Sequence, residues 1–219
     1  MPPGACDYTM EHHDNRKFSA IIRVYEKRLA EFGASPKGVL WKNVDGQLLR
    51  FELLARVIPA EAASQTISVS DLGCGYGALF DFLLTLPGVE IASYRGYDVS
   101  GAMLEQAAKR ITDPRAVFAR SEEALEVADY SFVSGAYNLM MQAAMLEWRD
   151  YTARSLRRLW DRTAKGLAFN MLGAARPVAV GNLYRTPPDF FIDLFRRLKA
   201  EVTLVDDYPL DEWTLLARR

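Results

Sequence analysis

Cysteine and histidine are scarce in this sequence, with two of each among 219 residues. Cys6 lies in a polar N-terminal segment and Cys74 lies among glycines, so we expect neither a disulfide bond nor a metal site. No stretch is long and apolar enough for a membrane span, and residues 1–17 lack the apolar core of a secretory signal. These absences predict a cytoplasmic protein that does not act at a membrane.

A surplus of charge of either sign is also missing, because 27 Lys and Arg residues stand against 28 Asp and Glu residues. The densest basic stretch, residues 154–162, alternates with apolar residues at helical spacing, as a solvated helix face does. Nucleic acid is therefore not an expected partner, and a small-molecule substrate is expected instead. The length suits one domain with a sizeable core, which we expect to act as a monomer or homodimer.

The first sixty residues are predicted to form a flexible tail followed by an N-terminal helical cap. The opening residues are polar and include Pro2, Pro3 and Gly4, which is typical of a loosely held terminus. Apolar residues then recur every three or four positions in residues 15–32 and 45–57, which predicts two amphipathic helices. We expect residues 61–219 to form the ligand-binding domain.

Strands and helices are predicted to alternate through the middle of the chain. The expected strands are residues 67–71, 94–98, 116–119, 130–134 and 166–171, and the expected helices are residues 77–86, 101–111 and 140–163. This alternation is typical of a doubly wound parallel sheet with helices on both faces.

The end of the chain breaks that alternation. A helix is expected at residues 188–199, and the strand-like runs 201–205 and 213–217 follow with only a turn containing Pro209 and Asp211 between them. Two strands joined so closely pair as an antiparallel hairpin. The predicted fold is thus an α/β, Rossmann-like sheet of seven strands with a C-terminal antiparallel hairpin and an N-terminal helical cap.

A glycine-rich loop follows the first predicted strand. Gly73, Gly75 and Gly77 let the backbone N–H groups and the start of a helix approach a ligand closely. Asp98 closes the second predicted strand, where a carboxylate accepts hydrogen bonds from the ribose hydroxyls of a nucleoside cofactor.

These glycines alone leave two cofactor classes open. The spacing Gly73-x-Gly75-x-x-Ala78 also fits the dinucleotide-binding fingerprint. Asp71 stands two positions before the first glycine, where negative charge attracts an ammonium group and gains nothing beside a pyrophosphate. Together with the terminal hairpin and the helices that precede the loop, Asp71 favours a cofactor with an amino-acid end.

Residues 71–77 resemble the first motif of the class I S-adenosylmethionine-dependent methyltransferases. Residues 96–100 resemble the second-strand motif of that family, residues 130–139 its fourth-strand motif, and residues 169–171 and 212–214 its fifth and last strands. The resemblance covers about residues 65–219 and implies S-adenosylmethionine as the cofactor.

The resemblance also implies roles for single residues. Asp71 and the loop backbone would hold the methionine end, Asp98 the ribose, and Val99 and Met103 the adenine. Many relatives place an Asp after the third strand for the adenine amino group, and Ser121 or Glu122 occupies that place here. The remaining implied cofactor residues are Cys74, Ser134 and Gly135, although Cys74 also suits a packing role inside the loop.

Methyl transfer needs an aligned acceptor and a dry pocket, and a base where the acceptor carries a proton. The catalytic candidates are Asn138 and Tyr137, after the fourth strand, and His13, in the tail with the only other histidine. The substrate candidates are Tyr25, Trp41, Arg50, Tyr184 and Arg185. Arg50 and Arg185 invite an anionic substrate, or else pair with carboxylates or hold the cofactor carboxylate.

The expected activity is methyl transfer from S-adenosylmethionine to an oxygen or nitrogen atom of a small molecule. Two alternatives remain at this point. One is a cofactor-binding regulatory or partner protein without its own activity, because no clear base stands out. The other is a nicotinamide-dependent oxidoreductase, because of the glycine spacing.

Overall fold

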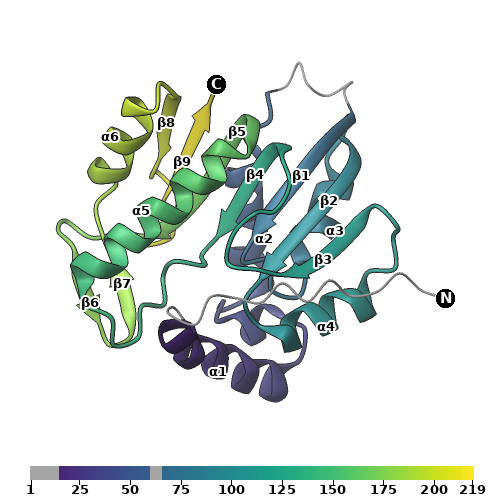
Figure 1. Cartoon of the computed structure of the whole chain (residues 1–219), viewed down its shortest axis with the longest axis horizontal. Coiled ribbons are helices and arrows are strands. Elements are labelled where there is room, and N and C mark those ends of the chain that lie inside the picture. The colour runs from purple at the N-terminus through teal and green to yellow at the C-terminus, as the bar shows by residue number, and fades with distance from the viewer. Residues whose placement is uncertain (1–14, 60–65) are drawn as a thin grey trace.

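The computed structural model describes residues 15–59 and 66–219 and contains one large mixed sheet (Figure 1). The spatial order of its seven strands is β3-β2-β1-β4-β5-β9-β8. The strands are β1 (Thr66–Leu72), β2 (Glu90–Asp98), β3 (Ala116–Arg120), β4 (Ala128–Ser134), β5 (Thr163–Leu172), β8 (Glu201–Val205) and β9 (Glu212–Arg218). The first five are parallel, and β9 pairs antiparallel with both β5 and β8. The predicted Rossmann-like sheet with its terminal hairpin is confirmed.

The helices cover both faces of this sheet. They are α1 (Asn15–Phe32), α2 (Val44–Ala55), α3 (Ala78–Thr85), α4 (Gly101–Arg110), α5 (Met145–Asp161) and α6 (Asp189–Arg197), with a 3₁₀ turn, η1 (Pro36–Val39), after α1. Strand side chains alternate between the two faces, so Phe169 packs in the core under α5 and α6, while Ala168 packs in the core under α2 and α3. Within the described residues, every helix is too short or too polar to cross a membrane.

The strand order places the switch point of the sheet at β1. This strand pairs with β2 on one side and with β4 on the other, so the connections to its two neighbours leave in opposite directions. A crevice opens at the carboxyl ends of the strands at such a point, and ligands of open α/β sheets bind there. Asp71 lies at this end of β1, opposite Gly96 of β2 and Phe132 of β4.

Helix α1 has the bounds expected from its apolar spacing, and it lies below the sheet in Figure 1, across the carboxyl ends of the strands. Its Phe18 ring contacts the Tyr151 ring of α5 edge to face, with 5.4 Å between ring centroids. The expected flexible tail at residues 1–14 and the expected boundary near residue 60 lie outside the described residues.

One expectation about the C-terminal half is wrong, and one small hairpin there was not predicted. The helix expected from residue 140 begins at Met145, because the backbone N–H groups of Met140 and Met141 donate to the Asn182 carbonyl (2.9 and 3.2 Å) and Met141 adopts a left-handed φ of 53°. Asn182 belongs to the turn of a small hairpin that the sequence did not predict, formed by β6 (Val178–Val180) and β7 (Leu183–Arg185). This hairpin covers the end of the β4 loop.

Candidate functional site

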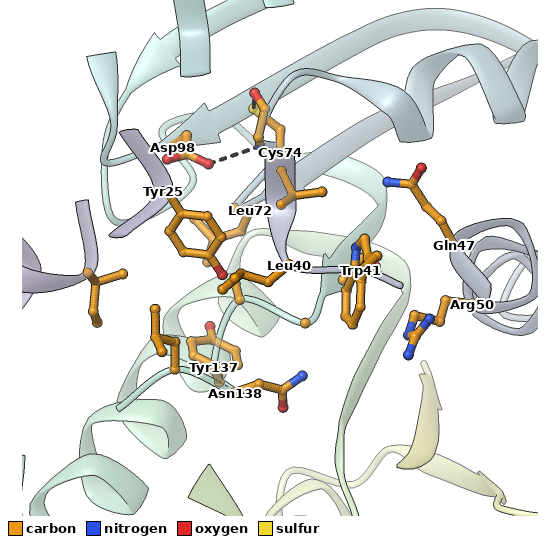
Figure 2. Close-up of a pocket in the computed structure, with 18 of the residues that line it drawn as sticks. Tyr25, Leu40, Trp41, Gln47, Arg50, Leu72, Cys74, Asp98, Tyr137 and Asn138 are labelled. Carbon is orange, nitrogen blue, oxygen red and sulfur yellow. Dashed lines mark hydrogen bonds between the residues drawn. The ribbon is translucent and has the colours of Figure 1, made fainter. Parts of the chain in front are cut away.

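A cavity of about 770 Å³ lies at the carboxyl ends of β1, β2 and β4. Helix α1, the loop that joins η1 to α2 and the loop after β4 also line it, and Figure 2 shows Tyr25, Trp41 and Asn138 from these three segments. Most of the residues expected at the site lie on its wall: Tyr25, Trp41, Arg50, Asp71, Gly73, Cys74, Gly75, Asp98, Val99, Met103, Ser121, Glu122, Ser134, Gly135, Tyr137, Asn138 and Arg185. The structure therefore brings together residues from eight separate segments.

The glycine loop turns sharply at the end of β1. The N–H groups of Gly73 and Cys74 both donate to the Tyr97 carbonyl of β2 (2.7 and 3.0 Å), which fixes the start of the turn. Gly73 has a φ of 77°, and a Cβ at this position would lie 2.6 Å from the Ala136 Cβ. Gly77 does not line the cavity, because it precedes α3 with a φ of 78° and its α-carbon faces Ile111. Its role is to permit the turn and the packing behind it.

Asp71 is buried, with 2% of its surface exposed, and it presents one free carboxylate oxygen. Oδ2 accepts a hydrogen bond from the Tyr94 phenol, whereas Oδ1 has no partner among the described residues. Burial raises the pKa of Asp71 to about 7, the Tyr94 hydrogen bond opposes that rise, and the nearby Asp98 charge adds to it. A cation placed beside Oδ1 would satisfy this oxygen and favour the ionised form.

Asp98 closes β2 on the same wall of the cavity. Its Oδ2 accepts from the Gly75 N–H (2.9 Å) and its Oδ1 from the Ser100 N–H (2.8 Å), so the carboxylate joins the glycine loop to the start of α4. Burial raises the pKa of Asp98, and these backbone N–H groups oppose the rise. Each oxygen keeps a second lone pair, which suits two neighbouring hydroxyl groups of a ligand.

Beyond Asp98 the cavity is lined by Val99, Met103, Ser121 and Glu122. The Ser121 hydroxyl is already used locally, because it donates to the Glu123 carbonyl (2.7 Å) and accepts from the Glu123 N–H (3.1 Å). Apolar side chains with a polar group at the rim are the surroundings that a purine ring requires.

The loop after β4 carries Tyr137 and Asn138. The Tyr137 phenol is hydrogen-bonded to the Ser155 hydroxyl at 2.8 Å, and burial raises its pKa above the usual value, so a phenolate base is disfavoured here. The Asn138 Oδ1 accepts from the Leu172 N–H (3.0 Å), while its side-chain nitrogen has no hydrogen-bond partner among the described residues. In Figure 2, Tyr25 faces the same space from α1.

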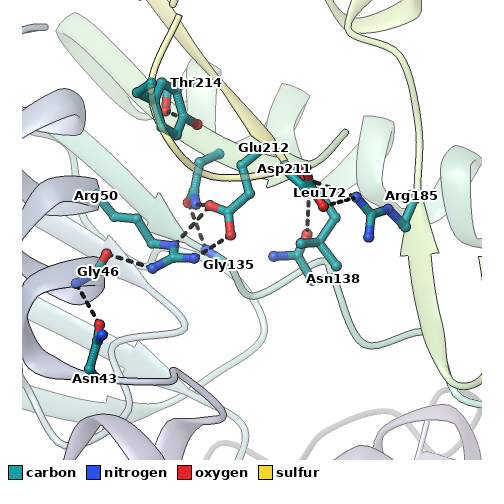
Figure 3. A network of polar contacts seen from close by, with 12 residues as sticks. Asn43, Gly46, Arg50, Gly135, Asn138, Leu172, Arg185, Asp211, Glu212 and Thr214 are labelled. Atoms are coloured by element: carbon teal, nitrogen blue, oxygen red, sulfur yellow. Dashed lines mark hydrogen bonds and ion pairs between the residues drawn. The ribbon is translucent and has the colours of Figure 1, made fainter. Parts of the chain in front are cut away.

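Arg50 does not present a free charge to the cavity. Its guanidinium forms a buried two-pronged ion pair with Glu212 of β9, and Nη1 donates to the Gly46 carbonyl at 2.5 Å (Figure 3). Glu212 also accepts from the Asn170 side chain (2.9 Å), whose Oδ1 accepts from the Gly135 N–H (2.9 Å). Glu212 is part of the last-strand motif but was not expected at the site, because its partner Arg50 is 162 residues away in the chain.

The remaining candidate residues differ in their position relative to the cavity. Arg185 lies at the rim, where its Nε donates to the Gly173 carbonyl (2.9 Å) and its Nη2 lies 3.4 Å from the Asp211 carboxylate. The expectation that Tyr184 contacts the substrate is wrong. Side chains of a strand alternate, and the Tyr184 side chain, between those of Leu183 and Arg185, points away from the cavity into the core. His13 lies outside the described residues.

Known proteins resemble this chain in sequence and in structure. No protein-family model matches the chain. A protein of Mycobacterium tuberculosis whose name describes it as a methyltransferase is 35% identical over 161 residues, which cover 72% of this chain and 96% of that protein. A solved S-adenosylmethionine-dependent methyltransferase of Leishmania major has a TM-score of 0.67 and 15% identity, with 96% of this chain and 87% of that one covered.

Magnesium protoporphyrin IX methyltransferase of Synechocystis PCC 6803, solved with bound S-adenosylmethionine, has a TM-score of 0.63 and 12% identity. The alignment covers 97% of this chain and 99% of that one. At such low identity, the two solved structures show a shared fold.

Proposed function

Because the Mycobacterium tuberculosis relative shows that this chain belongs to the methyltransferase family, we propose that it transfers the methyl group of S-adenosylmethionine to an oxygen or nitrogen atom of a small molecule. The observation that carries the proposal is the free oxygen of Asp71, buried beside a glycine turn and next to a second carboxylate, Asp98. The ammonium group of the cofactor complements the first carboxylate, and its ribose hydroxyls complement the second.

Asp71 argues against the nicotinamide alternative, whereas Asp98 suits the ribose of either cofactor. A pyrophosphate beside the Gly73–Gly75 turn would lie close to Asp71, and like charges in a buried site repel strongly. Val99 and Met103 would pack on the adenine, and Ser121 or Glu122 would take its amino group.

When bound, S-adenosylmethionine supplies a methyl group on a positively charged sulfur, so the protein needs no nucleophile of its own. The protein residues have to orient the acceptor and exclude water. Tyr25 and the Asn138 amide nitrogen are the groups that we assign to orientation, because each faces the cavity with unused hydrogen-bonding capacity among the described residues. The apolar residues of α1 and α5 would keep water out.

Calorimetric titration with S-adenosylmethionine and with its demethylated product, S-adenosylhomocysteine, tests the proposal. We expect both to bind, whereas NADH should not compete. Asp98→Asn should weaken binding by about tenfold or more, since a hydrogen bond to a charged group contributes about 1.5–3 kcal/mol. The control is Asp161→Asn, the same change at an exposed residue outside the cavity, which should leave the affinity unchanged.

Binding alone does not distinguish an enzyme from a regulatory protein. A panel of small hydroxyl and amine compounds, assayed with radiolabelled S-adenosylmethionine, should yield a methylated product. Cofactor binding without transfer to any compound of a broad panel would favour the alternative of a cofactor-binding partner protein.

A further inference from the structure

We infer that the methyl acceptor is an uncharged, predominantly apolar molecule with a hydrogen-bond-accepting oxygen. The inference rests on the proposed function, because it concerns the part of the cavity that remains once Asp71, Asp98 and the residues around them are assigned to the cofactor.

The wall of this remaining part is apolar on the side formed by α1, the loop after β4, α5 and β7. It consists of Phe18, Ile22, Leu139, Trp148, Tyr151 and Leu183. The Trp148 and Tyr151 rings pack with centroids 5.2 Å apart, and the Trp148 indole N–H is already used by the Tyr137 carbonyl (2.8 Å). The aromatic side chains therefore offer a fixed, water-excluding surface, which favours burial of an apolar ligand.

The opposite side contains charges, but they are already balanced. The Arg50 and Glu212 side chains are 8% and 3% exposed and pair with each other, and the guanidinium also lies over the Trp41 ring at 3.9 Å. An anionic acceptor would have to displace Glu212 from this pair. That exchange would leave a carboxylate buried without its partner, which is strongly unfavourable.

The rim does not supply a strong anion site either. Arg185 is held by the Asp211 carboxylate and by two backbone carbonyls, those of Gly173 and Asp211. Lys42 also lines the rim, but its side chain is exposed, where water and salt screen its charge. A buried anion would therefore gain little from either side chain.

The Tyr25 hydroxyl and the Asn138 amide nitrogen are donors that line the cavity and have no hydrogen-bond partner among the described residues. In Figure 2, Tyr25 extends from α1 and Asn138 lies below it, in the loop after β4. Two converging donors recognise an oxygen that accepts hydrogen bonds, such as that of a hydroxyl or carbonyl group. Together with the apolar wall, they define the acceptor class.

Two fluorescent probes with one carbon skeleton test the charge preference. N-phenyl-1-naphthylamine is uncharged, and 8-anilino-1-naphthalenesulfonate is the same molecule with an added sulfonate. Both are titrated into the protein saturated with S-adenosylhomocysteine. We expect the uncharged probe to bind about tenfold more tightly than the sulfonate, which would have to enter without a free cation.

Substitutions of the carboxylates that pair with arginine test why the uncharged probe is preferred. Glu212→Gln leaves Arg50 with an unbalanced charge and should reduce the preference for the uncharged probe by about fivefold or more. Glu126→Gln removes the same charge from an exposed ion pair with Arg95 and should not change the ratio. If Glu212→Gln fails to fold, Asp211→Asn replaces it, since that side chain is 88% exposed and partners Arg185.

The position of the probe is tested by filling the cavity. Ile22→Trp, in the apolar wall, should abolish binding of the uncharged probe, and Leu146→Trp, at a side chain 66% exposed outside the cavity, should not. Equal or tighter binding of the sulfonate by the unmodified protein, or full probe binding by Ile22→Trp, would overturn the inference. Because S-adenosylhomocysteine binding is measured in the same samples, its loss would instead contradict the proposed function.

Discussion

Arg50 and Glu212 form an ion pair that closes a ring of contacts around one side of the cavity. Glu212 binds Asn170, Asn170 binds the Gly135 N–H, Gly135 packs on the Trp41 ring, and Trp41 lies under the Arg50 guanidinium. The five residues come from α2, the loop before it, the loop after β4, and strands β5 and β9. Each contact fixes the position of a segment that lines the cavity, so the ring determines the shape of that wall.

Replacing one partner of the buried pair should destabilise the protein strongly. Arg50→Met leaves the Glu212 carboxylate buried without a counter-charge, and we expect a loss of about 3–5 kcal/mol in the free energy of unfolding. The measurement is urea denaturation followed by circular dichroism. The double variant Arg50→Met/Glu212→Leu should recover much of the loss, because no charge remains buried.

The matched control for this prediction is the exposed pair of Arg95 and Glu126, whose side chains are 27% and 60% accessible. Arg95→Met should cost less than about 1 kcal/mol, as exposed ion pairs do. An Arg50→Met variant as stable as the control would show that the buried pair does not organise the cavity wall.

Gly135→Ala should distort the wall and not merely strain the backbone. Gly135 has a φ of 70°, and an added Cβ would overlap the Trp41 ring. We expect a loss of about 2–4 kcal/mol, the sum of left-handed strain and overpacking, and weaker binding of S-adenosylhomocysteine. Urea denaturation and calorimetry measure the two effects.

Gly181→Ala separates the two causes. This glycine has a similar φ of 61°, but a Cβ there would meet no atom within 4 Å. Its substitution should cost about 1 kcal/mol and leave cofactor affinity unchanged. Equal effects at positions 135 and 181 would mean that contact with Trp41 is unimportant.

Asp71→Asn should stabilise the ligand-free protein in a pH-dependent way. The carboxyl pKa is raised to about 7 in the folded state, from 3.8 when unperturbed, so the folded protein retains a proton that the unfolded chain loses. The stability that this carboxyl gives the folded state is therefore fully present below pH 4 and is lost as the pH rises to about 7. The variant should gain up to about 4 kcal/mol at pH 8 and almost nothing at pH 4.

The same substitution should abolish the preference for a cationic amino group. In the unmodified protein, affinity for S-adenosylhomocysteine should rise between pH 6 and pH 8 as Asp71 ionises, and Asp71→Asn should flatten this dependence. Asp113→Asn provides the control, because hydrogen bonds from Arg115 lower the pKa of this partly exposed carboxyl to about 2 and it stays ionised throughout the range. A pH-dependent affinity that survives in Asp71→Asn would remove the assignment.

Tyr137→Phe should retain methyl transfer with an unchanged pH profile, since the buried phenol is an unfavourable base. The lost hydrogen bond to Ser155 should cost about 1 kcal/mol of stability. Tyr25→Phe is the comparison, and it should raise the KM for the acceptor while leaving cofactor affinity intact. A large fall in kcat for Tyr137→Phe would instead restore Tyr137 as a catalytic group.

Local signals in the sequence were sufficient for the framework of the fold. The alternation of strands and helices, the glycines after Asp71 and the position of Asp98 all depend on neighbours within one βα unit, so periodicity and turn chemistry predicted them. The start of α5 was misplaced because residues 140–144 have helical composition, and contacts with Asn182 override it.

The features that were missed depend on contacts between distant segments. The pairing of Arg50 with Glu212 joins α2 to the last strand, and no pattern in a single sequence reports such a pair. Tyr184 was misassigned because its strand was not predicted, and the alternation of a strand decides which of three successive side chains faces the cavity. The charge of the acceptor region also depends on distant contacts. Only the structure showed that Arg50 and Arg185 each have a carboxylate partner.

Strand β9 has a consequence for how the molecule is made. It follows every other strand of the large sheet in the chain, yet it lies inside the sheet, between β5 and β8. During synthesis the edge of β5 therefore keeps unpaired backbone groups until β9 has emerged, and such an edge can pair with other chains. Glu212 begins this strand, so the sheet and the wall of the cavity are completed in the same late step, and a nascent chain that cannot yet bind its ligand is also one exposed to aggregation.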